Sequence, residues 1–427
     1  MMERLVLSHG QRLIGDQLVA CDVVITAGKI SQISDAGSAD TSDSDVIDLQ
    51  GAFVSPGLVD VHEHFRDPGE TEKETIKTGT QAAAHGGFTT VAAMPNVLPV
   101  PDTPERFAAQ LQRNVDQAIV HVQQYAPITQ GRTGDQLVAF DQMAALGAMA
   151  FTNDGNGVQT ADTMYLAMQQ AAVLGVPIVA HAEADSLVHG GVMHEGEISR
   201  KLGLPGIPSV SETAQVARDV TLAAATGAHY HVCHVSAAGT VAVLRAAKQN
   251  GVAVTAEVSP HHLLLNDHDI IRDDAQFKMN PPLGAPTDQQ ALLAGLLDGT
   301  IDIIATDHAP HTAAQKAQSM RQAPFGIVGN ETAFSLLYTK LVRPGVVSLA
   351  QLIDWLASRP AEVFGLSGAG RLTVGQPADI AVFDLATTET VTPEYFQSKG
   401  HNSPFMGETV AGQTVLTMVG GTVVYQR

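Results

Sequence analysis

Two histidines separated by one residue, His62 and His64, follow a short apolar run at residues 53–59. If that run is a β-strand, side chains two residues apart point to the same side, so both imidazoles face one point at the end of the strand. Two convergent imidazoles are half of a tetrahedral zinc site. Arg66 continues the same row, and its guanidinium is suited to an anionic group of a substrate. These residues therefore predict a bound metal and a negatively charged substrate.

The middle of the chain alternates between strand-like runs and Ala-, Gln- and Leu-rich segments. Such alternation is typical of parallel strands joined by crossover helices, and eight repeats predict an α/β fold built on a (β/α)8 TIM barrel. The expected strands are residues 53–65, 87–96, 118–128, 147–154, 176–183, 229–236, 252–260 and 301–310. The expected helices are residues 102–116, 135–146, 160–174, 212–226, 237–249 and 287–297.

Both ends of the chain differ from the middle, because they contain short alternating apolar runs without helix-like segments between them. Neither end has enough apolar residues to bury a core alone. We therefore expect residues 1–52 and 366–427 to form one small composite β-sandwich domain beside a metal-binding barrel at residues 53–365.

Metal-binding side chains recur where the predicted strands end, and barrel active sites lie at the C-terminal ends of the strands. The candidates at five of these ends are His62, His64, Asp154, His181, His234 and Asp307. Imidazole and carboxylate ligands suit Zn2+ ahead of Mn2+, Co2+ or Fe2+. Because six ligands are too many for one tetrahedral ion, we expect two ions per chain, bridged by Asp154 and a hydroxide. Such a pair activates water and polarises a carbonyl group.

A simpler interpretation exists for each histidine alone, since an isolated histidine at a strand end is usually a hydrogen-bonded structural residue. The joint pattern across five strands favours ligands instead. His261 and His262 are adjacent, so on a strand they point apart and are interpreted as structural, while His308 is expected to support a ligand from behind. Asp60 could orient a ligand or cap a turn, and Glu183 is expected to make a structural hydrogen bond.

Composition excludes several classes of protein. The 427 residues carry a formal net charge of −20, which argues against sequence-independent nucleic-acid binding because that requires a basic surface. Cys21 and Cys233 belong to no Cys-x-x-Cys motif and are expected to be reduced thiols in a cytoplasmic protein. The first residues lack the apolar core of a signal peptide, and no run reaches the length of a membrane helix, so no membrane association is expected.

Two segments carry a family resemblance. Residues 60–69, Asp-Val-His-Glu-His-Phe-Arg-Asp-Pro-Gly, resemble one signature of the dihydroorotases of the amidohydrolase superfamily, and residues 305–311 resemble the other. The likeness extends over most of residues 50–335, and the β-rich ends resemble the sandwich domain of that family. Many relatives bridge their metals with a carboxylated lysine, whereas residues 152–155 contain Asp154 and no lysine. This resembles the long bacterial dihydroorotases, in which an aspartate takes that place.

The resemblance implies a metal-dependent cyclic-amide hydrolase, a dihydroorotase. Such an enzyme reversibly cyclises N-carbamoyl-L-aspartate to L-dihydroorotate plus water in de novo pyrimidine (UMP) biosynthesis. It also implies a metal-bound hydroxide as nucleophile, with Asp307 as general acid/base. Arg66, Asn96 and His311 resemble residues that hold the substrate carboxylate, Asn280 resembles a contact to the ring amide, and the loop after the last strand supplies backbone contacts. The complete set of expected substrate contacts is His64, Arg66, Asn96, Asn280, His311, Phe325 and Gly326.

Two other functions remain as alternatives. Another cyclic-amide hydrolase, such as a hydantoinase or allantoinase, is disfavoured by Arg66 with Asn96 and by the missing lysine. A non-catalytic scaffold, for example for aspartate transcarbamoylase, is disfavoured by the complete ligand set. A homodimer and an association with aspartate transcarbamoylase are left open as partner expectations beside the small-molecule substrate. Residues 309–325 are expected to be a mobile lid over the mouth, with an ordinary surface connection as the alternative.

Overall fold

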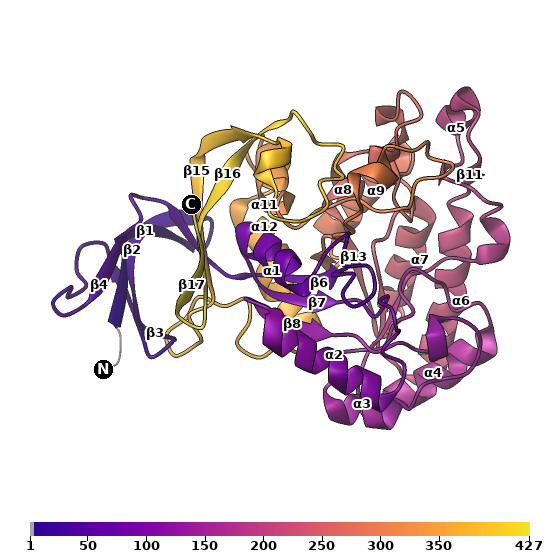
Figure 1. Cartoon of the computed structure of the whole chain (residues 1–427), viewed down its shortest axis with the longest axis horizontal. Helices are drawn as coiled ribbons and strands as arrows, with labels where there is room; N and C mark the ends of the chain where they lie inside the picture. The colour runs from indigo at the N-terminus through magenta and orange to yellow at the C-terminus, as the bar shows by residue number, and fades with distance from the viewer. Residues whose placement is uncertain (1–3) are drawn as a thin grey trace.

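The computed structural model describes residues 4–427, which form a barrel with a separate sheet beside it (Figure 1). Seven short parallel strands of the barrel fall into two sheets. The first contains β6 (Leu58–Glu63), β7 (Phe88–Ala93) and β8 (His121–Gln124). The second contains β9 (Ile178–Ala180), β12 (Tyr230–Val232), β13 (Val254–Val258) and β14 (Ile303–Ile304).

Single parallel bridges join these two sheets into a ring. Phe151 occupies the fourth strand position, where it pairs with Ala126 after β8 and with Ile178 of β9. On the other side, Glu63 of β6 pairs with His308, which follows β14. The ring therefore has eight strand positions in chain order, and the predicted (β/α)8 barrel is confirmed.

Helices surround the ring, and those predicted from the sequence lie within a few residues of their expected positions. Their ends have ordinary caps: the side chain of Thr103 accepts a hydrogen bond from the backbone of Arg106, and Gly175 ends its helix in the left-handed conformation. The helices around the barrel are α1 (Ile76–His85), α2 (Pro104–Gln117), α3 (Phe140–Leu146), α4 (Ala161–Leu174), α6 (Val210–Thr226), α7 (Ala238–Gln249), α9 (Pro286–Leu297), α11 (Ala333–Leu337), α12 (Leu349–Ile353) and α13 (Arg359–Val363).

Short elements fill the connections at the mouth of the barrel. They are α5 (Glu197–Leu202), the two-stranded pair β10 (Met193–His194) and β11 (Gly206–Ile207), α8 (Pro260–Leu264) and α10 (Ala313–Lys316). Of these, α10 lies in the segment that was expected to be a lid. Among residues 4–427, no helix combines the length and the apolar character that crossing a membrane requires.

Segments from near the two ends of the chain meet in one sheet, as expected, on one side of the molecule (Figure 1). We call it the terminal sheet. Its strands are β1 (Arg4–Ile14), β2 (Gln17–Thr26), β3 (Lys29–Asp35), β4 (Asp45–Asp48), β5 (Phe53–Pro56), β15 (Ile380–Thr390), β16 (Thr409–Val419) and β17 (Thr422–Gln426).

One strand assignment differs from the sequence analysis. Residues 53–65 were expected to be a single barrel strand, but β5 pairs with β15 and β1 of the terminal sheet, and only β6 enters the barrel. Gly57 separates the two, and its N–H donates to Asp379 O at 2.9 Å, next to β15. A continuous apolar run therefore serves two sheets in succession. The predicted division into two domains, with limits between residues 52 and 53 and between residues 365 and 366, stays a prediction.

Aromatic packing joins the terminal sheet to the barrel. Phe383 of β15 stacks on Phe334 of α11 with ring centroids 3.8 Å apart, and it also faces Phe53 at 6.4 Å. All three are buried in the same apolar cluster as the barrel core. The terminal sheet is thus packed against the barrel rather than tethered to it.

Candidate active site

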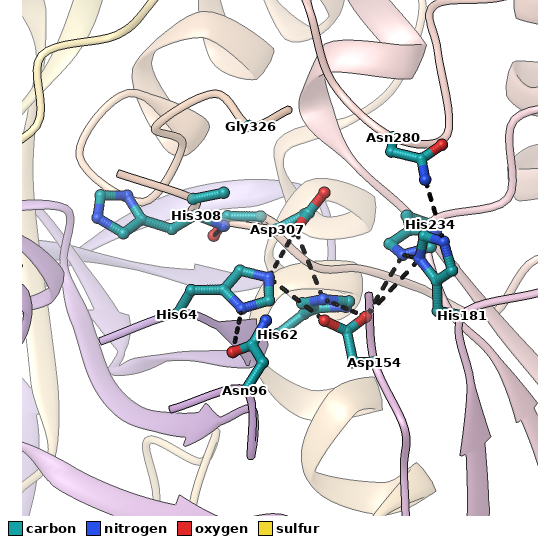
Figure 2. Close-up of polar contacts among 12 residues, drawn as sticks. His62, His64, Asn96, Asp154, His181, His234, Asn280, Asp307, His308 and Gly326 are labelled. Carbon is teal, nitrogen blue, oxygen red and sulfur yellow. Dashed lines mark hydrogen bonds and ion pairs between the residues drawn. The ribbon is translucent and has the colours of Figure 1, made fainter. Parts of the chain in front are cut away.

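The six predicted metal ligands come together at the C-terminal mouth of the barrel, and all of them are buried. Figure 2 shows their side chains pointing toward one another from different strand ends. The candidate ligand atoms form three sets, and within each set the atoms lie within 4.8 Å of one another. The sets are His62 with His64 and Asp307, Asp154 with His181 and His234, and His62 with Asp154 and Cys233. The first two sets contain only predicted ligands.

Asp154 belongs to the second of these sets and also lies close to two histidines of the first. Its Oδ1 is 3.4 Å from His62 Nε2 and 3.7 Å from His234 Nε2, and its Oδ2 is 3.6 Å from His64 Nε2. Asp154 Oδ1 and His62 Nε2 are both buried and have no hydrogen-bond partner among the described residues. Buried polar atoms without partners are costly, and a cation held between them removes that cost. The donor set therefore fits a metal site.

Cys233 makes the third set, which was not predicted. The thiol is fully buried, and that burial, together with the nearby carboxylate of Glu257, raises its pKa well above the ordinary value. This set shares His62 and Asp154 with the predicted ligands, so Cys233 is a further candidate ligand that the sequence did not single out.

The two aspartates of the cluster are ionised. Burial alone would raise their pKa values, but the neighbouring imidazoles outweigh it. The imidazoles of His62, His234 and His64 hold the pKa of Asp154 well below its usual value, and the pKa of Asp307 is also lowered, by His62 and by its hydrogen bond with His64. Asp307 Oδ1 is 3.1 Å from His64 Nε2. Both groups can therefore bind a cation, and Asp307 can accept a proton.

Glu257 of β13 supports His62 from behind, and it was not predicted. Its Oε1 lies 2.6 Å from His62 Nδ1, and its Oε2 lies 3.1 Å from His231 Nε2. Burial opposes ionisation, but these two imidazoles lower the pKa of Glu257 below its ordinary range. A carboxylate on Nδ1 keeps the proton there and leaves Nε2 free to bind a metal. The available signal was the one charged residue in the strand β13.

Three site residues lie in the left-handed region of backbone conformation, which is uncommon for residues other than glycine. They are Arg66 with φ 58°, His234 with φ 32° and Asp307 with φ 50°. Each one directs its side chain into the mouth just after a strand has ended. Strained positions of this kind persist only where the surrounding contacts hold them.

Asp60 provides one such contact. Its Oδ1 accepts hydrogen bonds from the backbone N–H of His62 at 3.2 Å and of Thr306 at 3.0 Å, and its Oδ2 accepts one from the Thr306 hydroxyl. Asp60 therefore ties the first strand to the last one beside both His62 and Asp307. The sequence left two roles open for Asp60, orienting a ligand or capping a turn. These hydrogen bonds favour the first role.

Four further residues of the mouth lie outside the three ligand sets. His308 was expected to support a ligand from behind, but Figure 2 shows its ring turned away from the ligand cluster, and its Nδ1 accepts a hydrogen bond from Gly329 N at 3.1 Å. Glu183 accepts one from Asn280 Nδ2 at 2.8 Å, which is the structural bond predicted for it. His261 and His262 are buried behind the cluster and belong to none of the three ligand sets.

A cavity of about 150 Å3 opens beside the ligands. Six of the seven expected substrate contacts line it: His64, Arg66, Asn96, Asn280, Phe325 and Gly326. His311, the seventh, lies next to them, with its Nε2 2.8 Å from Phe325 O and 3.5 Å from Arg66 Nη2. A larger hollow of about 700 Å3 lies at the terminal sheet and contains none of the predicted site residues.

Asn96 and Asn280 flank the metal-ligand cluster from opposite sides (Figure 2). Asn96 Oδ1 is 2.9 Å from His64 Nδ1, and Asn280 Nδ2 is 3.3 Å from His181 Nε2. Asn280 Oδ1 is buried and has no partner among the described residues. Each amide therefore touches a ligand histidine and the cavity at the same time.

Known proteins resemble this chain over nearly its whole length. A family model described as "Dihydro-orotase-like" matches residues 51–239. A dihydroorotase from Latilactobacillus sakei subsp. sakei (strain 23K) is 58% identical over 423 residues, covering 99% of each chain. One from Enterococcus faecalis (strain ATCC 700802 / V583) is 56% identical over 96% of each chain.

Solved structures show the same architecture. An L-hydantoinase (dihydropyrimidinase) from Arthrobacter aurescens superimposes with a TM-score of 0.88 at 26% identity, covering 100% of this chain and 96% of that one. A dihydropyrimidinase from Brevibacillus agri NCHU1002 gives a TM-score of 0.87 at 23% identity, covering 99% and 95%.

Replacing Glu257 tests the support of His62. We expect Glu257→Gln to weaken metal binding by about 10- to 100-fold, because the neutral amide no longer fixes the proton on His62 Nδ1. The affinity is measured by competition between metal-free protein and a chromophoric chelator. Glu331→Gln is the matched control, since Glu331 is an equally buried carboxylate whose histidine partner, His85, lies outside the cluster. Equal affinities for the wild type and Glu257→Gln would contradict the assignment.

Proposed function

This chain belongs to the dihydroorotase family, and we propose that it interconverts N-carbamoyl-L-aspartate and L-dihydroorotate in pyrimidine biosynthesis. The observation that carries the proposal is the position of Arg66. Its buried guanidinium lines the cavity beside the metal-ligand cluster, and His311 adjoins it. A substrate for this cavity therefore needs a cyclic amide next to the ligands and an anionic group next to the arginine.

We assign two Zn2+ ions to the cluster. His62, His64 and Asp307 would hold one, His181 and His234 the other, and Asp154 would contact both. When bound, such ions activate a water molecule as nucleophile and polarise the amide carbonyl. The separation of the ligands into two sets around Asp154 supports this assignment.

Asp307 is the candidate acid/base. It is ionised, it reaches the cavity, and its backbone conformation is held beside Thr306 by Asp60. In the hydrolytic direction its carboxylate accepts a proton from the attacking water and donates it to the departing ring nitrogen. In the direction of ring closure, the same group accepts the amide proton and returns it to the water that leaves.

Arg66, Asn96 and His311 are the candidates for binding the substrate carboxylate. A guanidinium can donate two parallel hydrogen bonds to a carboxylate, which fixes orientation as well as charge. Asn280, on the opposite side of the cavity, is the candidate partner of the ring amide, and the backbone at Phe325 and Gly326 closes the remaining wall. This arrangement would hold the scissile bond toward Asp307.

A comparison of substrates tests the proposed function against the hydantoinase alternative. That alternative needs a test because the similar solved structures are those of a hydantoinase and a dihydropyrimidinase. Purified protein with its metal content measured is assayed with dihydroorotate, hydantoin and allantoin. We expect turnover of dihydroorotate to exceed that of the other two by at least about 100-fold, because only dihydroorotate offers a carboxylate to Arg66. Preferred turnover of hydantoin or allantoin would refute the proposal.

The acid/base role is tested by Asp307→Asn. We expect nearly normal metal content and a loss of at least about 3 kcal/mol of transition-state stabilisation, since the amide cannot take up the proton. Turnover and metal content are measured together, with the exposed Asp298→Asn as control. Turnover of Asp307→Asn close to that of the wild type would rule out this role.

The carboxylate contact is tested by Arg66→Lys. The lysine keeps the charge but loses the planar pair of donors, so we expect the KM for dihydroorotate to rise about tenfold with a smaller change in kcat. Steady-state kinetics measure both, and Arg245→Lys is the control because Arg245 is partly exposed and pairs with Asp298 away from the mouth. Unchanged KM and kcat would remove Arg66 from the site.

Other expectations from the sequence stay predictions. They are the cytoplasmic location, the homodimer, the association with aspartate transcarbamoylase and the role of residues 309–325 as a lid.

A further inference from the structure

Asn402 lies in the connection between β15 and β16 of the terminal sheet, yet its side chain is bound at the barrel mouth. Its Oδ1 accepts a hydrogen bond from His311 N at 2.9 Å. Its Nδ2 donates to Ala309 O and to Gly326 O, both at 3.0 Å. Asn402 is only 3% exposed, so these three bonds satisfy a buried amide with two donors and an acceptor. One side chain therefore links two segments of the cavity wall.

The chain around Asn402 is fitted closely to the mouth. A Cβ at Gly400 would lie 2.6 Å from Pro310 Cβ and 2.9 Å from His311 N, so the approach requires glycine. The backbone of Asn402 also accepts a hydrogen bond from Val328 N at 3.0 Å. In Figure 1 this connection is the yellow chain that leaves β15 and β16 toward the orange part of the barrel.

Gly326 is held from two sides. Its carbonyl oxygen accepts hydrogen bonds from Asn402 Nδ2 and, at 2.8 Å, from the buried ammonium group of Lys316 in α10. Its φ of +142° favours glycine, and a Cβ there would lie 2.9 Å from His311 Nε2. The position of this peptide therefore sets the space that is left for the His311 ring.

We propose that Asn402 is a positioning residue for the substrate carboxylate, acting through His311, which it contacts directly and also by way of the Gly326 peptide that limits the space of the His311 ring. The proposal rests on the proposed function, since it assumes that His311 binds that carboxylate. The terminal sheet then contributes to the substrate site through its β15–β16 connection, although none of its strands reaches the ligands. Without the amide, the backbone N–H of His311 and the two carbonyls would lose a buried partner, and both segments would have to shift.

Kinetics of Asn402→Ala in two backgrounds test this inference. In the otherwise native enzyme, we expect kcat/KM for dihydroorotate to fall at least tenfold, mainly through KM, with metal content unchanged. In the His311→Ala background, the same substitution should cost less than threefold, because the side chain through which Asn402 acts is already missing. An equal loss in both backgrounds would overturn the proposal.

Two further variants control for folding. Gln413→Ala removes a buried amide from the same terminal sheet, where Gln413 Nε2 donates to Val410 O at 3.0 Å, and we expect it to leave KM unchanged. Gly400→Ala keeps the Asn402 side chain but pushes its segment away from His311, so we expect it to raise KM as Asn402→Ala does. This variant replaces Asn402→Ala as the test if Asn402→Ala does not fold. A native KM for Gly400→Ala would contradict the proposal.

The same set of measurements separates this inference from the proposed function. If the native protein and Gln413→Ala do not turn over dihydroorotate, the proposed function fails and the inference fails with it. If both are active and Asn402→Ala costs the same with and without His311, only the inference fails.

Discussion

A buried carboxylate among four imidazoles is the interaction on which the rest of this structure depends. Among residues 4–427, Asp154 Oδ1 has no hydrogen-bond donor, although the ring nitrogens of His62, His181 and His234 lie 3.4 to 3.9 Å away. These nitrogens lie too far from Asp154 Oδ1 for ordinary hydrogen bonds, and a buried carboxylate oxygen without a partner is costly. Cations held between these atoms would remove that cost, and the barrel supplies the strand ends that hold the candidate ligands in place.

Holding the cluster open requires support from residues that touch no substrate. Asp60 ties the first and last strands together, and Glu257 fixes the tautomer of His62. The three left-handed residues turn their side chains inward at the point where the strands stop. At the cavity wall, Asn402 joins the connection between β15 and β16 to His311, Ala309 and Gly326. The site is thus built by contacts between segments that are far apart in the chain.

Strand periodicity and strand-end position were enough to pick out six residues that the structure brings together, because both are local properties of the sequence. His62 and His64 share a face by parity, and the others each follow an apolar run. The same logic misassigned β5, since an apolar run does not reveal that it changes sheets at Gly57. Glu257 and Asn402 were missed for a related reason: Asn402 lies about 90 residues from its partners His311 and Ala309, and no local pattern marks that contact.

Our central proposal is that this cluster would hold two Zn2+ ions, both in contact with Asp154. The most direct measurement is anomalous X-ray diffraction at the zinc edge from crystals of the native protein. We expect two peaks on either side of the Asp154 carboxylate, one near His62, His64 and Asp307 and one near His181 and His234. A single peak bound by Cys233, or no peak in contact with Asp154, would contradict it.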